Sequence, residues 1–181
     1  GNNYASASTS HGLVISTRRM NGARIKGSTL TVGGGTLNSD LARLLPQDGK
    51  GELLLPTGNC RTLGVVGQTL GGGIGPNTPW AGLTADCLRK ATVVTADGTV
   101  VTASATENPE LLWALRGAAG ANFGVVTDAE YELVKVPVTR ATTAGLLYPG
   151  RDAAMAAALA FQLVRAESER IEKTYETQES Q

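Results

Sequence analysis

The sequence predicts an α+β fold. Residues 88–104 hold two β-branched runs on either side of Asp97-Gly98, a dipeptide that strongly favours a tight hairpin turn. Residues 108–115 begin with Asn-Pro-Glu and continue with an apolar run, which is typical of a capped helix with Pro at its first position. Strand signals and helix signals of this kind recur along the chain, so a mixed fold follows.

Before the hairpin, the pattern predicts short strands and one helix. The expected strands are residues 12–16, 24–26, 28–32 and 52–55, with Gly27 between the second and the third. After the glycines at 33–35, the predicted helix has apolar residues at helical spacing, Asn38 or Thr36 as its cap and Pro46 as its stop; those apolar residues are Leu37, Leu41, Leu44 and Leu45.

After the hairpin, the helix at 109–115 ends before Gly117, and residues 123–136 return to strand. Apolar residues alternate there with glutamates, which indicates a strand buried on one face. Beyond Pro137 the pattern predicts a strand at 138–147 and a helix from 152 to about 175. We therefore expect one domain over residues 1–136 and the beginning of a second over residues 137–181.

Charge and residue usage exclude several classes of function. Sixteen basic and sixteen acidic side chains cancel, and a neutral chain without a basic stripe is a poor candidate for binding nucleic acid or an anionic membrane. The single histidine, His11, and two cysteines cannot build an ordinary structural zinc site, so no metal is expected. The chain begins with Gly1 rather than Met, which favours a fragment or a processed chain and leaves the compartment open.

Glycines gather in residues 56–75, PTGNCRTLGVVGQTLGGGIG. Such backbone can turn tightly or can approach an anion closely. The dinucleotide motif G-x-G-x-x-G lacks its usual strand and acidic residue, and the P-loop Gly-Lys-Ser/Thr is absent. From the residues alone, a tight structural loop and a ligand-binding loop are equally well supported.

Several stretches occur together in a fixed order. They are GNNYAS (1–6), GLVISTRRMNG (12–22), the glycine-rich segment 56–75, AGLTADCL (81–88), VVTADGTVV (93–101) and NPELLWALRGAAGANFGVVT (108–127). This combination resembles the FAD-binding domain of the vanillyl-alcohol oxidase / p-cresol methylhydroxylase (PCMH) superfamily, and most of all the berberine-bridge-enzyme-like oxidases. The resemblance covers residues 1 to about 136. It implies a PCMH-type FAD-binding domain of two α+β subdomains, the first incomplete, followed by the start of a substrate domain.

The resemblance also implies an FAD site. Many relatives attach the flavin ring through a His in a G-H-S motif and a Cys in a G-x-C motif. Gly58-Asn59-Cys60 matches the second motif, so Cys60 is the candidate for a thioether, whereas Asn2 replaces the His and excludes a second link. Gln68 falls where relatives often carry a His that donates to the flavin N1–C2=O edge. The implied cofactor-binding residues are Gly1, Asn2, Asn3, Tyr4, Gly58, Cys60, Gly64, Gly67, Gln68, Gly71, Gly72, Gly73, Gly75, Gly82, Leu83, Asp86, Gly124, Val125 and Val126.

The implied function is that of an FAD-dependent oxidase. Hydride would pass from an alcohol, sugar or related small-molecule carbon to the flavin, and oxygen would reoxidise it. The alternative is a truncated or degenerate flavin-fold domain without activity, which Asn2 favours. No catalytic residue is assigned, because the base is expected in the substrate domain. Substrate, oligomeric state and localisation are not predicted, although relatives are often secreted.

Structural interpretations stand beside these roles. Cys60 is either the flavin tether or an inert buried thiol. We expect Cys87 in the core and Trp113 packed inward with its helix. Trp80 either packs or lines a pocket, and His11 is expected in a surface loop.

Overall fold

The computed structural model describes residues 14–45, 52–118, 120, 122–136 and 149–179, the last twelve of these by backbone alone. Its contacts divide the chain into two units, Gly1–Thr139 and Arg140–Gln181, and each is described by itself. The first unit holds the sheet and five short helices among its described residues. The prediction that the second unit begins a substrate domain stays a prediction.

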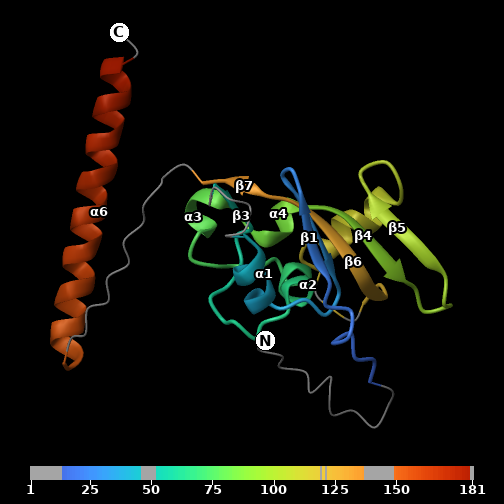
Figure 1. The fold of residues 1–181 in the computed structure, drawn as a ribbon. Coiled ribbons are helices and arrows are strands. Elements are labelled where there is room, and N and C mark those ends of the chain that lie inside the picture. Colours follow the sequence, from blue (N-terminus) through green and yellow to red (C-terminus); the bar gives the residue numbers. More distant parts are fainter. Residues whose placement is uncertain (1–13, 46–51, 119, 121, 137–148, 180–181) are drawn as a thin grey trace. The chain divides into compact units, whose positions relative to one another are not determined.

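An antiparallel sheet organises the first unit (Figure 1). Its five strands lie in the order β1-β2-β6-β4-β5. Their bounds are β1 Ala23–Lys26, β2 Thr29–Gly33, β6 Val125–Glu132, β4 Leu88–Val94 and β5 Val100–Ser104. The β1–β2 and β4–β5 hairpins confirm the turns predicted at Gly27 and at Asp97-Gly98. The late strand β6 lies between β2 and β4, so residues more than thirty positions apart in sequence complete the sheet.

Alternation along the strands places the core on one face of the sheet. In β6 the residues Val126, Ala129 and Tyr131 are buried, while Asp128 is exposed. A register shift between β4 and β6 explains why Val126 and Ala129 share that face although they are three residues apart. Tyr131 is fully buried, and its hydroxyl lies 2.9 Å from Thr69 Oγ1. This pair places a polar contact inside an otherwise apolar core.

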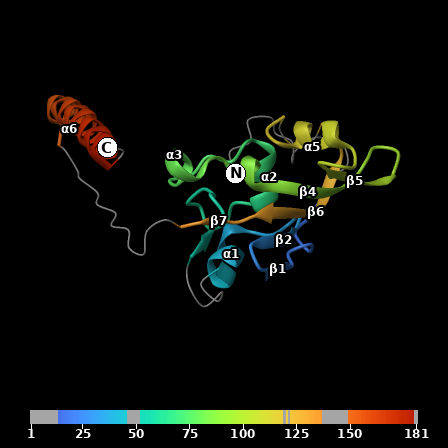
Figure 2. The same cartoon turned by 90° about the horizontal axis from the view of Figure 1, so that it is seen from above.

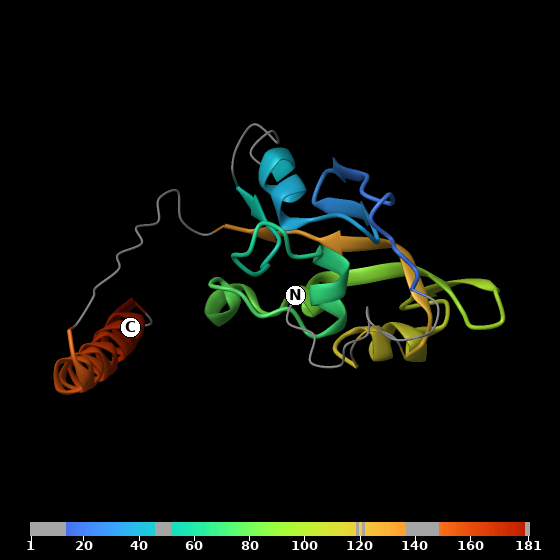
Figure 3. The same cartoon turned by 90° about the horizontal axis from the view of Figure 1, so that it is seen from below.

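Short helices surround the sheet. Their bounds are α1 Asn38–Leu44, α2 Val65–Leu70, α3 Thr78–Ala81, α4 Thr84–Cys87 and α5 Pro109–Leu115. In Figure 2, α2 and α5 lie on the side of β4, whereas α1 lies beside β1 and β2. Figure 3 shows the same arrangement from below. A second small sheet pairs β3 (Leu53–Leu54) with β7 (Val134–Lys135), which joins residues predicted as separate strands.

The second unit contains one long helix, α6 (Arg151–Glu179). The predicted helix at 152–175 is therefore confirmed and extends further at its C-terminal end. Met155, Leu159 and Leu163 are all exposed within this unit. The strand predicted at 138–147 lies outside the described residues.

Three local predictions are wrong. Residues 14–16 form no strand; the chain instead turns at Thr17–Met20 and bonds to the glycines that follow β2. The cap position of α1 is Leu37, since Asn38 is already helical and its side chain turns to another segment. Trp113 is 76% exposed, because Leu112 and Leu115 occupy the buried side of α5.

Candidate flavin-binding site

The loop that carries Cys60 wraps around the start of α1. The backbone N–H of Asn38 donates to Leu63 O at 3.0 Å, and that of Ser39 donates to Arg61 O at 2.9 Å. These first N–H groups of a helix have no partner within the helix, so the loop carbonyls satisfy them. The Asn38 side chain adds two bonds, from Nδ2 to Gly58 O (2.9 Å) and to Cys60 O (3.1 Å).

Cys60 lies at the surface of this loop. Its thiol is exposed and unpaired with any cysteine, which contradicts the interpretation as a buried inert thiol. The Sγ atom lies 3.4 Å from Thr62 Oγ1. Hydrogen bonds from the Thr62 hydroxyl and from the Thr62 backbone N–H lower the pKa of Cys60 below its ordinary value. A lower pKa raises the thiolate fraction at neutral pH, and the thiolate is the nucleophile. Cys87, by contrast, is buried in the core as predicted, and burial raises its pKa.

Gln68 ties three segments together. Its Oε1 accepts from Gly58 N at 3.1 Å, and its Nε2 donates to Ile74 O at 3.0 Å. The residue therefore joins the Cys60 loop, the helix α2 and the glycine-rich turn at 71–75. One of its two amide hydrogens is already used by Ile74, which leaves one for a bound ligand.

Internal packing explains part of the glycine-rich segment without any ligand. At Gly73, φ is +81°, and a Cβ would overlap Thr84 Oγ1. Thr84 is fully buried, and its single hydroxyl hydrogen is shared between two backbone acceptors, Pro56 O and, at 3.1 Å, Gly73 O. At Gly75, a Cβ would overlap the carbonyl of Thr57. These two glycines are needed for the fold itself, because backbone must pass close to backbone there.

Two other glycines of the same segment have no such internal reason. Added Cβ atoms at Gly64 and Gly67 would meet nothing within 4 Å among the described residues, whereas Gly72, which also faces open space, has a φ of +98° that itself favours glycine. Gly67 lies inside α2, where glycine costs about 0.5–1 kcal/mol relative to alanine. Gly64 and Gly67 are thus bare backbone beside open space, which fits a surface that a flat cofactor could cover.

Several of the remaining predicted residues are also held by contacts within the fold. Asp86 Oδ2 accepts from Leu83 N at 2.8 Å, and φ at Gly82 is +77°, so this turn is held by its own contacts. Val126 points into the core, and Gly124 lies where a Cβ would contact Val94 O. The other predicted residues are found at Gly71, which caps the end of α2, and at Val125, which begins β6. The predicted residues Gly1, Asn2, Asn3 and Tyr4 lie outside the described residues.

The fold therefore joins the Cys60 loop, α2 and the 71–75 turn. Gly117, which follows α5, also lies beside Gly72. Asn38 and Thr84 are the two side chains that hold these segments in place. The sequence offered Asn38 only as a helix cap and marked no role for Thr84, since each is a common polar residue near a helix start. Trp80, for which packing and pocket lining were both open, is 46% exposed.

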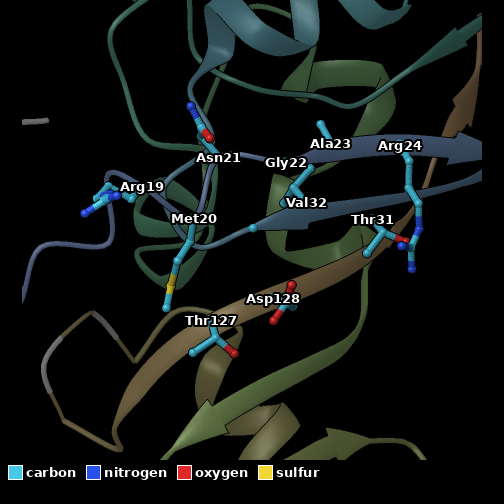
Figure 4. Close-up of a pocket in the computed structure, with 11 residues that line it drawn as sticks. Arg19, Met20, Asn21, Gly22, Ala23, Arg24, Thr31, Val32, Thr127 and Asp128 are labelled. Carbon is cyan, nitrogen blue, oxygen red and sulfur yellow. The ribbon is translucent and has the colours of Figure 1, made fainter.

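A separate hollow lies on the polar face of the sheet (Figure 4). It has a volume of about 480 Å³ and is bounded by β1, β2, β6 and the segment before β1. Arg19, Arg24 and Asp128 bring charges to it. None of the predicted cofactor-binding residues within the described part of the chain, from Gly58 to Val126, lines this hollow.

Two further classes of site receive no support among the described residues. No three His, Cys, Asp or Glu side chains lie close enough together there to hold a metal ion. Within the same residues, no helix combines the length and the apolar character needed to cross a membrane.

The exposed Cys60 thiol and the glycine-rich segment lie on an α+β scaffold that the comparisons with known proteins assign to a family. Residues 1–104 match the FAD binding domain family, more than half of the chain. The chain belongs to this family. The resemblance noted in the sequence is thereby confirmed, and so is the predicted mixed fold of PCMH-type FAD-binding domains.

Among curated relatives, an FAD-linked oxidoreductase of Aspergillus terreus is 42% identical over 137 residues, which is 75% of this chain and 27% of that protein. The (R)-6-hydroxynicotine oxidase of Paenarthrobacter nicotinovorans is 42% identical over 133 residues, 72% of this chain and 28% of that protein. The chain thus spans about a quarter of the length of these relatives.

Solved structures agree. The glucooligosaccharide oxidase of Acremonium strictum, which carries a 6-S-cysteinyl, 8α-N1-histidyl FAD, is 39% identical with a TM-score of 0.59, over 64% of this chain and 24% of that one. The BBE-like 1 protein of Physcomitrella patens is 35% identical with a TM-score of 0.58, over 65% of this chain and 25% of that one. The chain is therefore related to FAD-linked oxidoreductases of the BBE-like kind.

Proposed function

We propose that this chain forms the FAD-holding part of an oxidase that takes hydride from an alcohol, sugar or related small-molecule carbon and delivers it, through the flavin, to dioxygen. The observation that carries the proposal is the exposed Cys60 thiol with its lowered pKa, in the loop that leads to Gly64 and into the helix that holds Gly67. The named relatives act on a glucooligosaccharide and on 6-hydroxynicotine, and they support a small organic substrate of this general kind.

Within this proposal, Cys60 attaches the flavin through one thioether. The 6-S-cysteinyl link of the glucooligosaccharide oxidase supports attachment at the flavin C6 position. Replacing one C–H and one S–H bond by a C–S bond releases two electrons and two protons, which dioxygen accepts to form hydrogen peroxide. Asn2 has no nucleophilic ring nitrogen, so the histidyl link of that relative has no counterpart at this position.

Gln68 is the second residue that this proposal assigns to the flavin. Its remaining amide hydrogen can donate to negative charge that develops on a reduced flavin. A neutral amide brings a dipole and no net charge, so its stabilisation is weaker than that of a protonated histidine. We therefore expect a lower reduction potential than in relatives with His at this position.

The test is the fate of the yellow colour. The chain is produced with FAD, its visible spectrum is recorded, and it is then precipitated with acid. We expect colour in the pellet, and we expect Cys60→Ala to move the colour to the supernatant while Cys87→Ala leaves it in the pellet. Colour in the supernatant for the unaltered chain would reject the thioether. An absence of bound flavin under saturating FAD would instead favour the alternative, a flavin-fold domain without activity.

Oxidase activity needs its own measurement. Hydrogen peroxide release is followed with reducing oligosaccharides and with cyclic amines as two substrate classes. Release with one class and not with the other would assign the substrate, and flavin reduction under nitrogen without peroxide release in air would exclude oxygen as the acceptor.

A further inference from the structure

Asn38 stands out because its side chain is buried and incompletely paired. It is 8% exposed, and its Oδ1 has no hydrogen-bond partner among the described residues. Leaving such an acceptor without a partner costs about 1–3 kcal/mol. An apolar residue at this position of α1 would avoid that cost but would remove the donors of the amide, so the role of the asparagine follows from what its Nδ2 holds.

The other half of the same amide gives the reason. Both hydrogens of Nδ2 are used, one toward Gly58 O and one toward Cys60 O. The orientation of the amide follows from these partners, since the reverse orientation would set Oδ1 against two carbonyl oxygens. Asn38 therefore holds both ends of the three-residue motif Gly58-Asn59-Cys60.

The loop carbonyls share one direction. Those of Gly58, Cys60, Arg61 and Leu63 are all bonded to the side chain or backbone of the first residues of α1. With these carbonyls turned inward, the Cys60 side chain is left at the surface, and the N–H and hydroxyl of Thr62 face its sulfur. The Cys60 carbonyl accepts two hydrogen bonds, one from Asn38 Nδ2 at 3.1 Å and one from Leu63 N at 3.2 Å, and the first of these ties it to α1.

We propose that Asn38 is the positioning residue of Cys60: it holds the Gly58 and Cys60 carbonyls inward and so presents the thiol outward, beside Thr62, as the nucleophile for the flavin. This inference rests on the proposed function for the identity of the flavin. The presentation of the thiol can be measured without any cofactor, which separates the two proposals.

The experiment compares Asn38→Ala and Asn38→Asp with the unaltered chain. The alanine removes the two donors, and the carboxylate places negative oxygen against two carbonyl oxygens. Asn108→Asp is the matched control, because Asn108 Nδ2 also donates to a backbone carbonyl, that of Thr102 at 2.7 Å, in a different part of the fold. Each variant is treated with iodoacetamide from pH 6 to pH 10, and the rate at Cys60 is followed by mass spectrometry.

We expect the pH midpoint of Cys60 alkylation to rise in both Asn38 variants, and more in Asn38→Asp. The rate at pH 7 should fall about three- to tenfold, since the reactive species is the thiolate. Asn108→Asp should leave both values unchanged. The buried Cys87 serves as an internal gauge, because its alkylation reports unfolding. If Cys87 is alkylated in Asn38→Asp, that variant has unfolded, and the pH profile of Cys60 alkylation in Asn38→Ala is then the test of the inference.

An unchanged Cys60 profile in folded Asn38→Ala would overturn the inference, whether or not flavin binds. A shifted profile together with no flavin in any variant would uphold the positioning role and reject the proposed cofactor chemistry. With FAD present, we expect the fraction of colour in the acid pellet to fall in the Asn38 variants, while the total bound flavin before precipitation stays near that of the unaltered chain.

Discussion

Replacing Gly67 by alanine should make the free chain more stable and its flavin binding weaker. Gly67 lies in α2 between the buried residues Val66 and Thr69, and an added Cβ would meet nothing within 4 Å. Alanine is favoured over glycine inside a helix by up to about 1 kcal/mol, and the unfolded chain also loses freedom. We therefore expect the free energy of unfolding to rise by about 0.5–1 kcal/mol, measured by urea denaturation in the absence of FAD.

The same methyl group should oppose a cofactor that covers this surface. Inserting a methyl into a close contact costs about 1–3 kcal/mol, which corresponds to about a 5- to 150-fold rise in Kd. The measurement is a fluorescence titration with FAD in a Cys60→Ser background, where no tether can form. Gly73→Ala is the comparison, since its positive φ and the overlap with Thr84 make it destabilising by at least about 1–3 kcal/mol even without flavin. An unchanged Kd for Gly67→Ala would refute the assignment of open glycine backbone to the cofactor surface.

Three further predictions test the scaffold. Thr69→Val should lower the free energy of unfolding by about 1–3 kcal/mol, because it leaves the buried Tyr131 hydroxyl without its partner, and Tyr131→Phe in the same background should recover part of the loss in urea denaturation. Hydrogen bonds from Thr95 and Thr99 in its own turn lower the pKa of Asp97 to about 2, below its unfolded value. The stability that this carboxylate contributes is therefore present above about pH 4 and is lost as the pH falls toward 2. Asp97→Asn should make the free energy of unfolding depend less on pH between about pH 4 and pH 2, and an unchanged dependence would contradict this. Leu112→Ala should cost about 2–5 kcal/mol and Trp113→Ala less than about 0.5 kcal/mol in thermal and urea unfolding, since only the leucine is buried, and equal losses would contradict that assignment.

The two hairpins and the helices α1, α5 and α6 were predictable because their signals are local, whereas the short helices α2, α3 and α4 were not predicted. The Asp97-Gly98 turn between β-branched runs specifies the β4–β5 pair within its own residues. The position of β6 between β2 and β4 could not be predicted from local signals, because the residues of β6 do not specify which strands they pair with. The sequence supplied its burial pattern only, and the pairing follows from how the apolar faces of several strands meet.

The errors in sequence interpretation have a common physical source. Trp113 was expected inside because its helix is rich in apolar residues, but a seven-residue helix can bury only one side. Leucines at 112 and 115 take that side, so the tryptophan between them faces outward. Residues 14–16 are apolar enough for a strand. The turn at Thr17–Met20 follows them directly, and its Met20 carbonyl accepts from Gly35 N after β2, so these residues do not pair with the sheet.

The glycine-rich segment shows most clearly what a sequence can and cannot separate. A structural turn and a ligand loop were equally well supported by composition, and the structure shows which of these glycines the fold itself requires. Gly73 and Gly75 are required where backbone passes against Thr84 and Thr57, so a chain that never bound a cofactor would still need them. No contact among the described residues requires glycine at position 67, and glycine there weakens the helix that contains it. A residue that costs stability and touches nothing is expected where a partner must approach, and this glycine lies next to Gln68, whose side chain bonds to the Cys60 loop. The physical case for a cofactor surface therefore rests on the glycines that the fold does not need.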